Sequence, residues 1–294
     1  MIVLKNFEKL PCKTVITIGN FDGVHIAHRL LIEKTKSVAK QMNAKSLVFS
    51  FCPHTKQILS DPDFKTIYTT DEKRFLLSKL NIDYLMELPF NLDIANLNSV
   101  QFLNLLTQNL NCIGIVTGSD FKFGNDNFYP TFRNLKNNLV IENVSNINFG
   151  RKKISSTYIR KLLVQKDLDQ IEKMLGQKYF VMDKVIHGLK RNISLPTINF
   201  IPDKNKLLPP DGVYFTTVCI NNIYYKGVTN IGFNPTVNNN FRCIETHILD
   251  FKQNIYGQSV FVYFNKFIRP EIKFDSVAKL KMQIQKDVDY VISI

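Results

Sequence analysis

The sequence predicts an α/β protein in two parts: an N-terminal Rossmann-like parallel sheet, and a small C-terminal antiparallel β-barrel with a terminal helix. Through the first half of the chain, short apolar runs alternate with amphipathic segments, which is typical of a parallel sheet covered by helices. Near Gly176 the alternation ends, and strand-like runs follow one another with little helix between them, as in small barrels. We therefore expect one domain at residues 1–176 and a second at 177–294.

The elements expected in the first half are strands and helices in turn. In parallel sheets of this kind, ligands bind beyond the carboxyl ends of the strands, so polar residues that follow a strand are candidates for a site. The predicted strands are 15–18, 46–51, 83–88, 113–117 and 139–141, and the predicted helices are 28–41, 71–80, 99–110 and 155–164.

The elements expected in the second half are nearly all strands. Two of them are separated only by Asn221 and Asn222, which predicts a hairpin with a two-residue turn. A last helix is expected at 275–286. The predicted strands are 180–186, 212–220, 223–231, 243–249 and 259–264.

The composition of the 294 residues is that of a globular protein, with 45% hydrophobic and 21% charged residues. No apolar run is long enough to cross a bilayer, and the first ten residues lack the apolar region of a signal peptide. The five cysteines are scattered and form no Cys-x-x-Cys pair, which disfavours zinc and redox sites and fits reduced thiols. We expect a cytoplasmic protein with no membrane partner.

The formal net charge is +13, and basic proteins often bind nucleic acid. The lysines and arginines are spread along the chain, however, and no dense basic block stands out. A phosphate-bearing substrate explains a basic surface equally well. We therefore expect a small anionic substrate rather than nucleic acid, and a monomer or weak oligomer.

A glycine-bearing turn with two histidines, residues 19–28, lies between the first predicted strand and helix. Glycine lets the backbone approach an anion closely, and the free N–H groups of a first helical turn favour negative charge. His25 and His28 lie three residues apart, so both imidazoles project to one side and can donate hydrogen bonds to a phosphate. In this turn, which we call the histidine turn, the candidate residues are Gly19, Asn20, Phe21, Asp22, Gly23, His25 and His28.

Three further segments add polar groups at predicted strand or helix ends. His54 follows the second predicted strand and could touch a substrate. Gly118 and Gly124 flank an acid between aromatics. Ser155 or Ser156 can cap a helix, and the hydroxyls there, with Arg160, can hold a second phosphate. Each segment alone also fits an ordinary loop, turn or helix cap. The candidate residues are His54, Gly118, Asp120, Phe123, Lys153, Ser155, Ser156, Thr157 and Arg160.

Taken together and in this order, these four segments resemble the FMN adenylyltransferase module of bacterial bifunctional riboflavin kinase/FAD synthetases, part of the nucleotidyltransferase superfamily. The resemblance implies transfer of AMP from ATP to the phosphate of FMN, with pyrophosphate leaving. It implies that His25 and His28 contact ATP phosphates. Arg160, Ser156 and Thr157 would stabilise the transferring and leaving groups, and Asn20, Asp22 and Asp120 would help shape the nucleotide and metal site, with Mg²⁺ bridging the phosphates. His54 and Phe123 are candidate flavin contacts.

The second half resembles the riboflavin kinase module of the same enzymes, a small β-barrel. The resemblance rests on His187-Gly188, Pro196–Asn199, Asp211–Tyr214, Asn230–Thr236, Glu245–Ile248 and Phe267–Phe274, and the two resemblances cover about residues 10 to 290. It implies phosphorylation of riboflavin to FMN, with Mg²⁺-ATP as donor.

Chemistry suggests a role for several barrel residues. Thr197 and Asn199 are neutral oxygen ligands on one side of a strand and can complete a Mg²⁺ shell with ATP phosphates. Glu245 is the candidate base for the primary hydroxyl, with a surface strand residue as the alternative. Arg269 and Glu271 are expected near the flavin, with a salt-bridged strand end as the alternative.

Two departures from the family pattern qualify this interpretation. Ala27 stands where the family usually has glycine, and we expect activity to survive this smallest change. The stretch 189–195 lacks two glycines and is about two residues shorter, so we expect a weaker kinase or a nucleotide loop built differently.

The alternatives left open are an adenylyltransferase with a silent barrel, a nucleotidyltransferase with another acceptor, and a non-catalytic flavin or nucleic-acid binding protein. The leading hypothesis is a bifunctional enzyme acting on ATP, riboflavin and FMN, with FAD as product.

Overall fold

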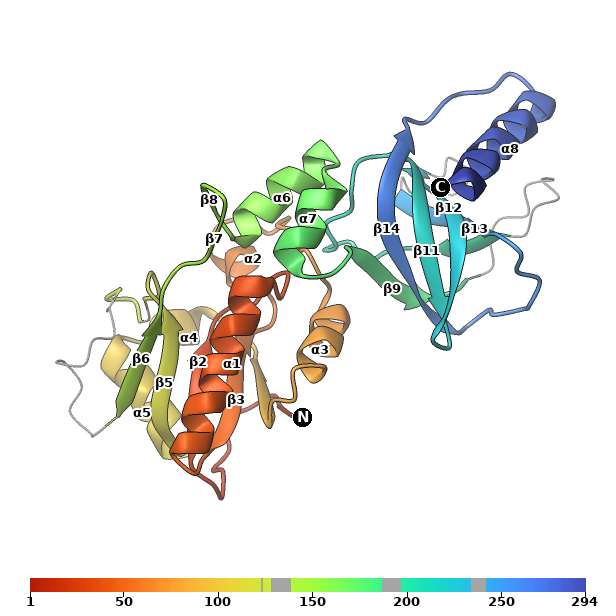
Figure 1. The fold of residues 1–294 in the computed structure, drawn as a ribbon. Helices are drawn as coiled ribbons and strands as arrows, with labels where there is room; N and C mark the ends of the chain where they lie inside the picture. Colours follow the sequence, from red (N-terminus) through yellow and green to blue (C-terminus); the bar gives the residue numbers. More distant parts are fainter. Residues whose placement is uncertain (123, 128–138, 187–196, 234–241) are drawn as a thin grey trace. The chain divides into compact units, whose positions relative to one another are not determined.

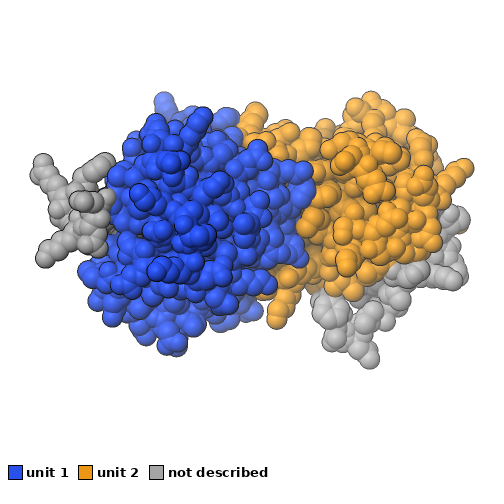
Figure 2. Space-filling view, turned by 90° about the horizontal axis from the view of Figure 1, so that it is seen from below, with its two compact units in different colours: residues 1–156 blue, residues 157–294 orange. Residues whose placement is uncertain are grey.

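The computed structural model of the chain describes residues 1–122, 124–127, 139–186, 197–233 and 242–294. It contains two compact units, Met1–Ser156 and Thr157–Ile294, which Figure 2 colours separately. Each unit is built around its own six-stranded sheet.

The sheet of the first unit is parallel throughout, as the sequence predicts. Its strand order is β1-β4-β3-β2-β5-β6, so the central strand β2 is flanked on both sides by strands that come later in the chain. The bounds are β1 Ile2–Leu4, β2 Thr14–Ile18, β3 Lys45–Phe51, β4 Tyr84–Leu88, β5 Cys112–Gly118 and β6 Val140–Val144. The short edge strand β1 was not expected from the sequence.

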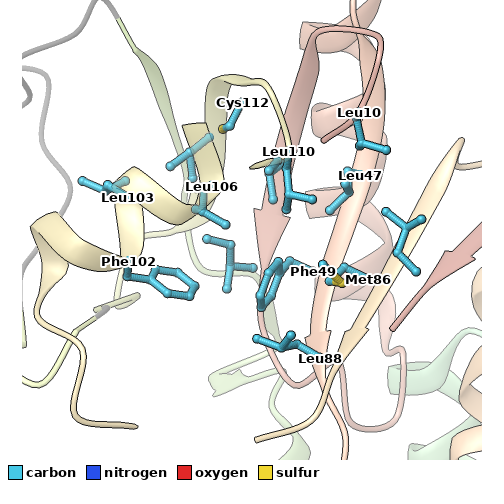
Figure 3. Close-up of a cluster of buried hydrophobic side chains, with 14 residues drawn as sticks. Leu10, Leu47, Phe49, Met86, Leu88, Phe102, Leu103, Leu106, Leu110 and Cys112 are labelled. Carbon is cyan, nitrogen blue, oxygen red and sulfur yellow. The ribbon is translucent and has the colours of Figure 1, made fainter. Parts of the chain in front are cut away.

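Helices cover both faces of this sheet (Figure 1). The helix α1 lies against β2, β3 and β5. On the opposite face, Phe102 and Leu106 of α5 pack with Phe49 and Met86 in one buried apolar cluster (Figure 3). The helices of this unit are α1 Ile26–Gln41, α2 Thr55–Leu59, α3 Thr70–Ser78, α4 Leu92–Ala95 and α5 Ser99–Asn109, with a two-stranded ribbon of β7 Asn148–Phe149 and β8 Lys152–Lys153.

The sheet of the second unit is antiparallel, in the order β10-β13-β12-β11-β14-β9. A bridge between Ile186, two residues beyond β9, and Asn199 of β10 brings the two outer strands together, which closes the sheet as a small barrel. The bounds are β9 Phe180–Lys184, β10 Thr197–Phe200, β11 Gly212–Ile220, β12 Ile223–Phe233, β13 Arg242–Ile248 and β14 Ser259–Arg269.

The predicted hairpin between β11 and β12 is confirmed. Ile220 pairs with Ile223, and the two residues between them, Asn221 and Asn222, have φ of 49° and 64°. Positive φ at both central residues is the signature of a tight hairpin turn, and asparagine accepts it more readily than most residues.

Three helices accompany the barrel: α6 Ser156–Gln165, α7 Leu168–Leu175 and α8 Val277–Ser293. The terminal helix α8 runs further than predicted. The helix α7, which ends at Gly176 with φ 70°, contacts β14 and groups with the second unit. The domain boundary near residue 176 stays a prediction. In the described part of the chain, no helix is long and apolar enough to span a bilayer.

Candidate functional site

The histidine turn links β2 to α1 with an unusual backbone. Phe21, Gly23 and Val24 have φ of 48°, 88° and 40°. Positive φ is natural for glycine and costly for a β-branched residue such as valine, so the surroundings must hold this shape. Phe21 and Val24 are fully buried, and their packing supplies that restraint. The turn is therefore a rigid platform for the groups that follow it.

The two histidines of the turn lie face to face at the start of α1. Their ring centroids are 3.5 Å apart with an interplanar angle of 13°, and Phe21 meets the ring of His28 edge-on at 5.2 Å. His25 is the N-cap of α1, and its Nδ1 accepts a hydrogen bond of 3.3 Å from the backbone N–H of His28. This bond leaves Nε2 of a neutral His25 to carry the proton and act as a donor.

Both imidazoles are held in their neutral form. Burial lowers the pKa of His25 to about 4. Burial, the neighbouring His25 and the charge of Lys73 together lower the pKa of His28 well below its usual value. Nδ1 of His28 is buried and has no hydrogen-bond partner in the described part of the chain. Such a pair can donate hydrogen bonds to an anion at the helix N-terminus, and the anion would in turn favour protonation.

Asn20 and Asp22 tie the histidine turn to three other segments. The side chain of Asn20 donates to Thr55 Oγ1 at 3.0 Å, which places the turn beside the start of α2. Asp22 is buried, and its Oδ1 accepts from the backbone N–H of Ile67 at 2.8 Å. The backbone oxygen of Asp22 accepts from Ser156 Oγ at 2.8 Å. Both predicted site residues therefore shape the turn.

His54 stands next to Thr55 and caps α2. Its Nδ1 accepts from the backbone N–H of Lys56 at 3.1 Å, and its ring lies 4.6 Å from that of Phe64. The bond from Asn20 to Thr55 thus brings the segment that carries His54 to the histidine turn, although the two are far apart in the sequence.

Asp120 follows β5 and is paired with Lys153, another predicted site residue. Asn146 donates to both oxygens of Asp120 at 3.2 Å, and Ser119 also donates to it. These donors, with Lys153 as the largest cause, lower the pKa of Asp120. Gly118 ends β5 with open space where a Cβ would lie.

Ser156 begins α6, and its hydroxyl donates to the backbone oxygen of Asp22, while the cap predicted for Ser155 or Ser156 stays a prediction. Ser155 precedes it, while Thr157 and Arg160 follow on α6 in the second unit. Phe123 lies outside the described residues.

Two small residues of the histidine turn have ordinary backbone conformations. Ala27 lies in the first turn of α1 without positive φ, so this position does not require glycine. Gly19 has ordinary φ, and a Cβ there would only touch the ring of Phe21.

One buried residue of this region was missed by the sequence analysis. Lys73 of α3 is 9% exposed, and its Nζ donates to Ser50 Oγ at 2.8 Å and to the backbone oxygen of Asn20 at 3.4 Å. Desolvation lowers its pKa. A lysine on a helix with glutamate and arginine neighbours is typical of a solvated face, so no signal in the sequence could have identified it.

In the second unit, three predicted kinase residues come together across β10 and β13. Thr197 Oγ1 donates to Glu245 Oε1 at 2.9 Å, and Asn199 is paired with Glu245 in the sheet register. Asn199 Nδ2 lies 3.4 Å from Thr197 Oγ1. Two neutral oxygen donors beside a carboxylate form a donor set that suits Mg²⁺ with nucleotide phosphates. The described residues hold no group of three or more His, Cys, Asp or Glu that could bind a metal unaided.

Arg269 and Glu271 are engaged within the protein. Arg269 makes a bidentate ion pair with Asp287 of α8, with Nε–Oδ1 at 3.0 Å and a terminal nitrogen to Oδ2 at 2.7 Å. Glu271 Oε1 accepts from Asn230 Nδ2 at 3.0 Å. For Arg269, the salt-bridged strand end is therefore the arrangement found, and its flavin contact stays a prediction. The loop 189–195 lies outside the described residues.

Comparison with known proteins assigns a family to each part of the chain. A family model described as FAD synthetase matches residues 7–158, and one described as riboflavin kinase matches residues 175–294. The class is therefore a two-domain transferase of flavin metabolism, with the histidine turn in one domain and the Thr197–Glu245 cluster in the other.

Relatives of similar length carry both domains. A bifunctional riboflavin kinase/FMN adenylyltransferase of Buchnera aphidicola is 32% identical over 98% of this chain and 96% of its own. One of Bacillus subtilis is 34% identical over 94% of this chain and 90% of its own. The chain belongs to the family of bifunctional riboflavin kinase/FMN adenylyltransferases.

A solved structure of the same fold is also known. A crystal structure described as a macrolide-efflux protein of Streptococcus pneumoniae superposes with a TM-score of 0.88 and 30% identity, covering 100% of both chains. It agrees with the two-domain fold along the full length.

Proposed function

We propose that this enzyme adenylates FMN to FAD at the histidine turn and phosphorylates riboflavin to FMN at the Thr197–Glu245 cluster. The observation that supports adenylyl transfer is the stacked pair His25–His28 at the N-terminus of α1. The family to which the chain belongs supports both halves.

The adenylyl transfer needs no covalent intermediate on the enzyme. A phosphate oxygen of FMN attacks the α-phosphorus of ATP in line, and the bond from that phosphorus to the bridging oxygen of pyrophosphate breaks. The task of the protein is to position the reactants and stabilise charge. Nε2 of His25 and the ring of His28 would donate to ATP phosphates, beside the N–H groups of α1. Ser156, Thr157 and Arg160 would bind the transferring and leaving groups.

The kinase reaction needs a base and a fixed nucleotide. Glu245 would accept the proton of the primary ribityl hydroxyl as its oxygen attacks the γ-phosphorus of ATP, and ADP would leave. The hydrogen bond from Thr197 orients the Glu245 carboxylate. Thr197 and Asn199 would hold Mg²⁺ with the nucleotide, and the ion would neutralise phosphate charge when bound.

We place the enzyme in the cytoplasm and expect a monomer or weak oligomer. All five cysteines are free thiols, which fits a reducing compartment. ATP, riboflavin and FMN are then its small-molecule partners.

Product analysis of the pure protein with Mg²⁺-ATP tests both halves. FAD formed from FMN, and FMN formed from riboflavin, would support both sites. FAD from FMN without FMN from riboflavin would mean that the altered loop 189–195 has disabled the barrel. Formation of neither product would contradict the proposal. Glu245→Gln and His28→Ala, each assayed for both reactions, assign each reaction to its site because each should abolish one reaction and spare the other.

A further inference from the structure

Lys73 occupies a position that the two reactions above leave without a role. It belongs to α3, whose N-cap Thr69 and residue Glu72 form a capping box, so the helix start is fixed. The side chain points inward, and the residue is 9% exposed. A lysine this deeply buried is rare, because removing an ammonium from water is costly unless something compensates.

The ammonium of Lys73 has neutral hydrogen-bond partners. Its Nζ donates to Ser50 Oγ at 2.8 Å and to the carbonyl of Asn20 at 3.4 Å, and Ser50 Oγ also donates to that carbonyl at 3.3 Å. These acceptors stand at the carboxyl ends of β2 and β3, the edge of a parallel sheet where ligands bind.

Arg74, the next residue of the same helix, has carboxylate partners, whereas Lys73 has none among the described residues. Arg74 is paired with Glu87 at 2.6 Å and with Asp71 at 2.9 Å. Within the part of the chain that the structure describes, no carboxylate lies within 4 Å of Lys73 Nζ. A buried cation without a paired carboxylate lowers stability, and an anion bound nearby would offset that loss.

More distant ionisable groups partly support the ammonium. Cys52, Glu87 and Asp22 favour its charged form, and Arg74 opposes it. Toward the histidine turn, the charge of Lys73 acts on His28, which also faces His25. Lys73 therefore adds a positive charge whose field reaches the neutral ring of His28.

We propose that Lys73 is a positioning residue for adenylyl transfer: its Nζ donates to the Asn20 carbonyl of the histidine turn, and its positive charge acts through space on a substrate phosphate bound at this turn. This inference rests on the proposed adenylyltransferase function of the turn. His25 and His28 would then donate to a phosphate directly, and Lys73 would act on the same phosphate through its field.

The charge also has a consequence for His28. Burial is the main cause that keeps this ring neutral, and the charge of Lys73 adds to it, so that the two stacked imidazoles do not both become charged before the phosphate binds. Without Lys73, His28 would protonate at higher pH.

The test compares Lys73→Met and Lys73→Arg with the wild type. Lys79→Met is the matched control, because Lys79 is an exposed lysine at the end of the same helix. We expect Lys73→Met to lower kcat for FAD formation from FMN about 10- to 100-fold. Lys73→Arg should recover part of the rate, and Lys79→Met should leave it unchanged.

The pH dependence separates positioning by charge from a purely structural role. In Lys73→Met the pKa of the His28 ring, followed by NMR, should rise, and the pH profile of FAD formation should move to higher pH. Formation of FMN from riboflavin, catalysed by the other unit, and the NMR spectrum of the first unit report whether the variant is folded. An unchanged His28 pKa in a folded Lys73→Met variant would overturn the inference.

The wild type distinguishes this failure from failure of the proposed function. If the wild type makes no FAD from FMN, the adenylyltransferase assignment fails first. If the wild type makes FAD and Lys73→Met makes it at the same rate, only the role of Lys73 is lost.

Discussion

The imidazole rings of His25 and His28 are stacked with their centroids 3.5 Å apart, while the backbone N–H of His28 donates to Nδ1 of His25. Two charged imidazoles at this distance would repel each other, so the arrangement is stable only while the pair carries at most one proton beyond its neutral form. The stacked histidine pair is therefore a pH-sensitive part of the fold.

The stability of the first unit should fall as the pH drops from about 7 to 4. The pKa of His25 is about 4 in the folded protein, against an ordinary value of 6.5 for an unfolded chain, so the unfolded chain binds more protons in this interval. The stabilisation is complete above pH 6.5 and is lost as the pH falls. At a pH of about 5, His25 alone should cost about 2 kcal/mol. Urea unfolding at about pH 7.5 and about pH 5 measures this loss.

His25→Asn is the matched variant for that measurement, because asparagine keeps a side-chain acceptor at the N-cap but does not titrate. It should lose less stability than the wild type over the same pH interval. Equal losses in both proteins would mean that other groups cause the pH dependence.

Replacing Glu245 should stop only the kinase reaction. In Glu245→Gln the acceptor for the hydroxyl proton is lost while the size of the side chain is kept, so kcat for FMN formation should fall about 10²- to 10⁴-fold. FAD formation from FMN should stay at the wild-type rate. If Glu245→Gln retains the wild-type kinase rate, Glu245 is not the base but an ordinary surface residue of its strand.

The ion pair of Arg269 and Asp287 should stabilise the terminal helix more than it serves the substrate. The side chain of Asp287 is 4% exposed and that of Arg269 is 16% exposed. Asp287→Asn leaves a mostly buried guanidinium without its carboxylate, which should cost about 3 kcal/mol. Chemical unfolding of the variant, with KM for riboflavin measured beside it, checks this.

The outcome for KM decides between the two roles of Arg269. If KM for riboflavin is unchanged while stability falls, Arg269 anchors α8. A large rise in KM in Asp287→Asn, with stability unaffected, would favour the flavin contact predicted from the sequence.

Replacing Gly124 should destabilise the contact between its loop and the start of α5. Its φ is +77°, and a Cβ there would collide with the backbone nitrogen of Ser99. The same loop brings Asp126 to Ser99, where Oδ1 accepts from the backbone N–H at 3.0 Å. Gly124→Ala should therefore destabilise the first unit by more than the roughly 1–2 kcal/mol of a left-handed alanine.

Gly150→Ala is the control for that comparison. Gly150 also has positive φ, +58°, but nothing lies within 4 Å of its Cβ position. Gly150→Ala should therefore lose only the stability that positive φ costs an alanine, roughly 1–2 kcal/mol. Equal urea midpoints for the two variants would contradict the collision at Ser99.

Much of the first unit could be predicted because local pattern and tertiary role coincide there. The run 14–18 is largely apolar on both faces, as a central parallel strand must be, and it is fully buried as β2. The histidine turn could also be predicted, because glycine and histidine together at a strand-to-helix junction are typical of a phosphate-binding turn. The hairpin at Asn221 and Asn222 was predictable because its turn chemistry is local.

Short elements were predicted less well. The strand β1 has three residues, too few for a periodicity to be seen, and it depends on pairing with the distant residues Tyr84–Met86. The helix α7 was missed, although Gly176 at its C-terminal end marks the change in character of the sequence.

The sequence by itself determined the two-part fold and the histidine turn and supplied the candidate polar residues of each site, because these follow from local pattern and from motifs of specific chemistry. Only the tertiary structure decided which of those residues meet. It brought Thr197 to Glu245, Asp120 to Lys153 and Arg269 to Asp287, and it buried Lys73 beneath Asn20. Such contacts join residues 18 to 53 positions apart, so they cannot be predicted from local pattern. Burial also changes the charge state of a side chain, and burial depends on the tertiary structure rather than on the spacing of residues in the sequence.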